Sequence, residues 1–166
     1  VDSQSVRPPN RTELSSQADA VPVAELYDAL HVRGIHYGPS FRAITELHVQ
    51  PWGVWGLARL CSAPEDAQTY PIHPTLLDAC MHGLAALPQS HSLFAMVPVA
   101  LGTMTLYRRA GSQVRFCLRT EVHSDKRTSL MVSITITDPD RDELVATIED
   151  LEVSALSAGS RHAPLA

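Results

Sequence analysis

The sequence of 166 residues lacks the short motifs that mark the common nucleotide- and ester-processing enzymes. It has no glycine-rich phosphate loop, no dinucleotide-binding fingerprint and no G-x-S-x-G turn around a nucleophilic serine. These absences remove the usual basis for predicting a kinase, a nicotinamide-dependent enzyme or a serine hydrolase.

Long apolar runs and excess positive charge are also missing. The stretch 79–107 has no charged residue, but His, Pro, Ser, Gln and Gly interrupt it, so it does not resemble the roughly 20 apolar residues of a membrane span. Thirteen Lys and Arg against eighteen Asp and Glu give a formal net charge of −5, the wrong sign for binding a phosphate backbone. We therefore expect neither a membrane nor a nucleic-acid partner.

Cysteine is scarce, and the number is odd. Cys61, Cys80 and Cys117 are widely spaced in apolar surroundings, which favours neither a disulfide framework nor a zinc site. They are predicted to be buried thiols in a reducing compartment such as the cytoplasm, with a nucleophilic Cys80 as the alternative to inert packing. The histidines are scattered without a close trio of ligands, so no metal is expected.

The composition, with 45% hydrophobic and 19% charged residues, predicts one soluble globular domain. Residues 1–20 are polar and have few large apolar side chains, so they are predicted to be a linker or disordered tail, and 157–166 a second tail. The folded domain is expected over 21–156. The start at Val1, without Met, suggests a piece excised from a longer protein.

Helical periodicity appears in two places. Apolar side chains recur at helical spacing within 22–33, where Pro22 suits the first turn and Gly34 the end; they are Val23, Leu26, Tyr27 and Leu30. A second helix is predicted from Pro74 to Leu87, and its apolar residues cover most of its circumference. A helix of that kind is usually central in a fold.

Strand-like patterns account for most of the rest of the expected folded domain. A hairpin is predicted for 44–50 and 54–60, around Pro51-Trp52-Gly53. Four further strands are predicted at 97–107, 113–123, 128–137 and 144–154. Their short polar connections suggest successive antiparallel neighbours. The predicted fold class is α+β: an antiparallel sheet curled around a buried helix, the hot-dog arrangement.

Asp78 and His82 are the clearest candidate pair for a functional site, because residues four apart share one face of a helix. A carboxyl group buried in an apolar helix is costly as an anion, which would favour its proton-donating form. The alternative is that Asp78 only accepts a hydrogen bond from His82 or caps nearby backbone. The turn Tyr37-Gly38-Pro39 either aims the Tyr37 hydroxyl at a buried acceptor or is a plain packing turn.

His36 and His73 stand at element boundaries. Each could serve as a ligand or a base, but single histidines in such places are more often structural or exposed.

Two segments, Gly34-Ile35-His36-Tyr37-Gly38-Pro39-Ser40-Phe41 and His73-Pro74-Thr75-Leu76-Leu77-Asp78-Ala79-Cys80-Met81-His82, resemble the dehydratase domains of modular polyketide synthases. That family carries a G-x-x-Y-G-P-x-F block followed by an H-P-x-x-x-D-x-x-x-Q/H block on the hot-dog helix. The resemblance extends over roughly 21–156. Val99, after Pro98, replaces the aromatic residue that the family usually has there.

The family places two hot-dog units side by side, the first supplying a catalytic His from an H-x-x-x-G block and the second the Asp. This chain resembles the second, C-terminal unit, because none of its histidines is followed by Gly four positions later. The resemblance implies that Asp78 is the general acid, that His82 orients either Asp78 or the departing hydroxyl, and that Tyr37 hydrogen-bonds at the site. The implied substrate-binding residues are Gly38, Pro39, Phe41, His73 and Pro98.

The implied reaction removes water from a 3-hydroxyacyl chain held on the phosphopantetheine of an acyl carrier protein, with no other cofactor. The implied partners are that carrier and either a first hot-dog unit or a second copy of the chain. Three alternatives remain: a relative that uses the same acid for cyclisation or thioester hydrolysis, a non-catalytic docking or dimerisation module of a synthase, and a free-standing homodimeric acyl-thioester enzyme.

Overall fold

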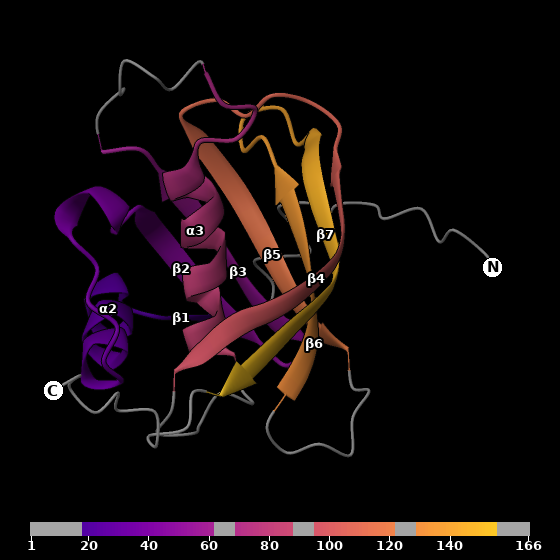
Figure 1. Cartoon of the computed structure of the whole chain (residues 1–166). Helices are drawn as coiled ribbons and strands as arrows, with labels where there is room; N and C mark the ends of the chain where they lie inside the picture. Colours follow the sequence, from indigo (N-terminus) through magenta and orange to yellow (C-terminus); the bar gives the residue numbers. More distant parts are fainter. Residues whose placement is uncertain (1–17, 62–68, 88–94, 122–128, 156–166) are drawn as a thin grey trace, which may run out of the picture.

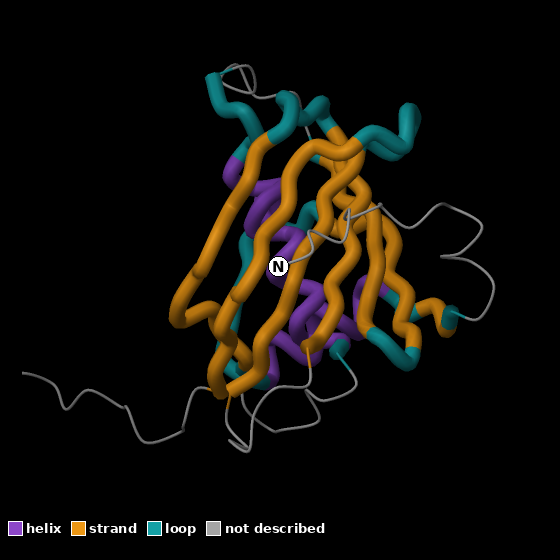
Figure 2. The backbone as a smooth tube through the Cα atoms, turned by 90° about the vertical axis from the view of Figure 1, so that its right-hand side faces the viewer, coloured by secondary structure: helices purple, strands orange, loops and turns teal. Residues whose placement is uncertain are grey.

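A seven-stranded antiparallel sheet curves around one central helix in the computed structural model, which describes residues 18–61, 69–87, 95–121 and 129–155 (Figure 1). The strands are β1 (Asp19–Ala20), β2 (Ile44–Gln50), β3 (Gly53–Arg59), β4 (Met96–Leu106), β5 (Gln113–Glu121), β6 (Ser129–Thr137) and β7 (Leu144–Ala155). The helices are α2 (Val23–Val32) and α3 (Pro74–His82), with 3₁₀ turns η1 (Pro39–Phe41) and η2 (Gly83–Ala86). Both helices lie on the same side of the sheet (Figure 2).

The predicted hot-dog fold is confirmed, and most element bounds agree within one or two residues. Asp19 and Ala20, expected in the tail, pair with Val49 and His48 and extend the sheet by a short strand. The rest of the expected tails, 1–17 and 157–166, lies outside the described residues. None of the described helices is long and apolar enough to cross a bilayer.

The position of β4 differs from the prediction of successive neighbours. The strand order is β1-β2-β3-β5-β6-β7-β4, so β4 pairs with β7 at one edge while β5 pairs with β3 in the interior. The burial of the two strands agrees with this order: residues 114–118 of β5 are buried on both faces, whereas most of β4 is exposed. The short connection around Gly111 therefore links an edge strand to an interior strand.

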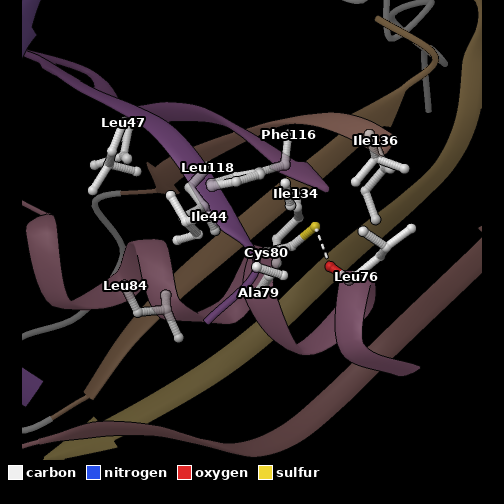
Figure 3. Packing of buried hydrophobic residues seen from close by; sticks show 14 of the residues in the cluster. Ile44, Leu47, Leu76, Ala79, Cys80, Leu84, Phe116, Leu118, Ile134 and Ile136 are labelled. Atoms are coloured by element: carbon white, nitrogen blue, oxygen red, sulfur yellow. Dashed lines mark hydrogen bonds between the residues drawn. The ribbon is translucent and has the colours of Figure 1, made fainter. Parts of the chain in front are cut away.

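The core forms where α3 meets the concave face of the sheet. Leu76, Ala79 and Cys80 of α3 pack near Phe116, Leu118, Ile134 and Ile136 of the sheet (Figure 3). The expected helix to Leu87 ends at His82 and continues as η2. A Cβ on Gly83 would lie 2.5 Å from Leu118 Cδ1, so glycine permits the close approach of this helix end to β5.

The three cysteines are free, and only two of them are buried. Cys80 donates to the Leu76 carbonyl at 3.1 Å, and burial raises the pKa of its thiol, which favours the packing interpretation over a nucleophile (Figure 3). Cys117 is buried. Cys61 is exposed, so its predicted burial is wrong: it follows the end of β3, beyond the buried Leu60.

Candidate active site

Asp78 and His82 are in contact on α3, as residues four apart on a helix should be. His82 Nε2 lies 2.9 Å from Asp78 Oδ2. The His82 side chain is fully buried, whereas the Asp78 side chain is 38% exposed. The predicted burial of Asp78 is therefore wrong, because its carboxyl group extends from α3 to the surface of the chain. A molecule in solution can reach this carboxyl group, while the imidazole supports it from the interior.

Tyr27 is the site residue that the sequence did not reveal. Its hydroxyl lies 3.3 Å from His82 Nδ1 and accepts a hydrogen bond from the Ile44 N–H at 3.3 Å. Burial raises the pKa of the Tyr27 phenol, so its hydroxyl keeps its proton. One signal was available: Tyr27 follows Leu26 on the apolar face of α2, and a buried hydroxyl usually has a partner.

Tyr37 contacts the site through its ring. The ring centroid lies 3.9 Å from that of His82 with an interplanar angle of 41°, and 6.3 Å from that of Tyr27. The expected hydrogen bond from the Tyr37 hydroxyl to a buried acceptor does not occur among the described residues. Burial, followed by the negative charge of Asp78, raises the pKa of the Tyr37 phenol to about 12.

We expect the Tyr37 phenol to titrate near pH 12 in the folded chain, against about 10 in the unfolded chain. Because the folded pKa is the higher one, this residue's stabilising contribution is complete below pH 10 and is lost as the pH rises towards 12. Phenolate absorbance during a pH titration measures this, and Tyr37→Phe should remove one high-pH step while leaving that of Tyr27, whose pKa burial also raises. Asp78→Asn should lower the Tyr37 pKa by removing the nearby charge, and an unchanged titration would contradict the placement of Tyr37 beside Asp78.

The other implied substrate-binding residues divide into two groups. Gly38, Pro39 and Phe41 are exposed, and η1, which contains Pro39 and Phe41, lies against α3. For His73 and Pro98 the structure shows other contacts: the His73 ring caps the first turn of α3 by accepting the Thr75 N–H at 3.2 Å, and Pro98 pairs with β7 in the edge strand β4.

His36 also has another partner. It is exposed, and its Nδ1 lies 2.7 Å from that of His31. Within the described ranges, no group of three or more His, Cys, Asp or Glu side chains is arranged to hold a metal ion.

Comparison with known protein families places this site in context. A family model described as the polyketide synthase dehydratase N-terminal domain matches residues 6–163. The chain belongs to the polyketide synthase dehydratase family. Among curated relatives, it is 31% identical over 147 residues to the erythronolide synthase EryA2 of Saccharopolyspora erythraea, a match covering 87% of this chain and 4% of that synthase. The lovastatin diketide synthase lovF of Aspergillus terreus is 32% identical over 139 residues, covering 77% and 6%.

Solved dehydratase structures share the hot-dog fold. The dehydratase domain from the CurK module of curacin polyketide synthase superposes with a TM-score of 0.75 at 28% identity, covering 89% of this chain and 50% of that one. The CurJ dehydratase domain of the same synthase has a TM-score of 0.75 at 23% identity, covering 84% and 50%. The chain thus spans about half of these dehydratase domains and a small fraction of the curated synthases.

Proposed function

We propose that this chain is the acid-bearing, C-terminal hot-dog unit of a dehydratase that removes water from a 3-hydroxyacyl chain carried on the phosphopantetheine of an acyl carrier protein. The observation that carries the proposal is the Asp78 carboxyl group, open to the surface and backed by the fully buried His82. This arrangement leaves one carboxyl oxygen available to a substrate while the other is held by the imidazole.

The chemistry needs an acid and a base on opposite sides of the substrate. A base removes the proton from the carbon next to the thioester. The electrons of that C–H bond form the new double bond, the C–O bond at carbon 3 breaks, and Asp78 delivers its proton to the departing oxygen. The products are an enoyl thioester and one water, and Asp78 is left as a carboxylate that accepts a hydrogen bond from His82.

The relatives support an acid–base pair of this kind. Structures of the CurK dehydratase, which is 28% identical to this chain, include an Asp-to-Asn mutant and a His-to-Phe mutant, both described as inactive. The present sequence contains the Asp block but has no H-x-x-x-G block in its 166 residues. We infer that the base comes from a second hot-dog unit.

The assignment to the C-terminal unit rests on these motifs, although the family model that matches is described by its N-terminal domain. The H-P-x-x-x-D block of 73–78 lies on the central helix α3, and the Y-G-P block of 37–39 precedes it at η1. An N-terminal unit would instead need the histidine block that this chain lacks. Water loss from a 3-hydroxyacyl thioester, assayed with a first unit added, is the direct test.

The edge strand β4 is the surface we propose for pairing with that unit or with a second copy. Among the described strands, β4 pairs with β7 alone, and four large apolar side chains are exposed; they are Val99, Leu101, Met104 and Leu106. A long apolar edge strand is a template for pairing with another strand. The opposite edge differs, because the two-residue β1 covers part of β2.

We expect the isolated chain to sediment as a dimer at high concentration, because two copies can pair their β4 edges around a two-fold axis. Leu101→Lys, which places a charge on this edge, should shift the chain to monomer in sedimentation velocity. Val32→Lys is the matched control, since Val32 is 85% exposed on α2, and it should leave the dimer unchanged. A monodisperse monomer of the unsubstituted chain would contradict the proposed pairing surface.

A further inference from the structure

We propose that Tyr27 is a positioning residue that fixes the tautomer of His82 and thereby keeps the Asp78 proton available for the substrate. The inference rests on the proposed function of Asp78 as the general acid. Tyr27 lies on α2, His82 ends α3 and Ile44 begins β2, so one buried hydroxyl joins three elements that are far apart in sequence.

The hydrogen-bonding capacities of the groups determine the direction of each bond. The Ile44 backbone N–H can only donate, so the Tyr27 oxygen accepts it. The single hydroxyl proton of Tyr27 is then free to be donated to His82 Nδ1, 3.3 Å away. A neutral imidazole that accepts at Nδ1 carries its proton on Nε2, and Nε2 lies 2.9 Å from Asp78 Oδ2. His82 is therefore a donor to Asp78.

The opposite tautomer would work against proton transfer. With its proton on Nδ1, His82 would present a lone pair at Nε2, and a protonated Asp78 would donate to that lone pair instead of to the leaving hydroxyl. In the opposite tautomer the Tyr27 oxygen would accept from both Nδ1–H and the Ile44 N–H, and the buried Tyr27 hydroxyl proton would lose its acceptor His82 Nδ1. Tyr27 disfavours this arrangement.

Donation from Nε2 also stabilises the Asp78 carboxylate that forms when the proton is transferred. As Asp78 gives up its proton it becomes a carboxylate, and a hydrogen bond to the charged form strengthens as the charge develops. Because His82 is fully buried, water does not replace that donor from the interior side. Tyr27 thus acts on the acid through His82.

The tautomer can be read directly in the isolated chain from the ring ¹⁵N chemical shifts of His82, assigned by their loss in His82→Gln. We expect a protonated Nε2 and an unprotonated Nδ1. Tyr27→Phe keeps the aromatic ring but removes the hydroxyl, and it should move both shifts towards a mixture of the two tautomers. Tyr107→Phe, the same change at an exposed position, should move neither shift. A proton found on Nδ1 in the unsubstituted chain overturns the proposal, even if Tyr27→Phe does not fold.

Kinetics in a protein that also contains the first hot-dog unit provide the second readout. Tyr27→Phe should lower kcat about tenfold with KM little changed, as expected for one hydrogen bond that acts in the transition state. In the His82→Gln background the effect should largely disappear, because the donor of a Gln amide does not depend on a tautomer. An equal loss in both backgrounds would mean that Tyr27 acts by packing, and would overturn the proposal.

The two proposals fail in different ways. If Asp78→Asn leaves dehydration intact while His82 carries its proton on Nε2, then the acid assignment is wrong. The Tyr27–His82 hydrogen bond then fixes the tautomer but has no role in catalysis. If Asp78→Asn abolishes dehydration while Tyr27→Phe changes neither the ¹⁵N shifts nor kcat, then the acid assignment holds and the role of Tyr27 is wrong.

Discussion

Replacing Asp78 by Asn should lower the turnover of a 3-hydroxyacyl thioester by about 10²–10⁴-fold, the usual loss when a general acid is removed. The amide keeps the shape of the side chain and an oxygen that can accept from His82 Nε2, which lies 2.9 Å from Asp78 Oδ2. It has no acidic proton to give to the departing hydroxyl. The measurement is the rate of water loss in a protein that contains both hot-dog units.

The melting temperature separates a chemical role from a structural one. Because the Asp78 side chain is 38% exposed, we expect Asp78→Asn to leave the melting temperature nearly unchanged. Asp28→Asn is the matched control: it makes the same change at an exposed position on α2 and should affect neither rate nor stability. Activity of Asp78→Asn within tenfold of the unsubstituted protein would refute the acid assignment. A collapse in stability would favour the alternative in which Asp78 only holds His82 and the end of α3 in place.

Local patterns in the sequence predicted the elements well. Helical spacing with a flanking proline and glycine located α2, and runs of β-branched residues located β2, β5 and β6, because both signals depend on neighbours along the chain. The place of β4 in the sheet was not predictable in this way. It depends on how completely β5 is buried on both faces, which is a property of the assembled sheet.

In the site, too, contacts between neighbours along the chain were predictable and contacts between distant segments were not. The Asp78–His82 contact follows from a spacing of four on one helix, so the sequence predicted it. The contact of Tyr27 with His82 joins residues 55 apart and depends on how α2 packs near the end of α3. The exposure of Asp78 was mispredicted because an apolar helix was assumed to be covered on every side, whereas the sheet of this chain covers it from one side.

The largest effect we expect is the complete dependence of dehydration on a second hot-dog unit. A base must lie within about 3 Å of the proton that it removes, and it must stand across the substrate from the acid. The histidines considered as candidate bases already have other partners. His82 is buried and already bonded to Asp78 and Tyr27, His73 caps α3, and His36 is paired with the exposed His31.

The isolated chain should therefore bind a 3-hydroxyacyl pantetheine thioester weakly and leave it unchanged, with no mass loss corresponding to one water. Adding a first hot-dog unit that carries an H-x-x-x-G block should start the reaction. The same unit with that His replaced by Phe should not, which distinguishes supply of the base from simple completion of the β4 edge. Rapid dehydration by the isolated chain would mean that these 166 residues contain a base, and His36→Gln and His73→Gln would then be the first variants to identify it.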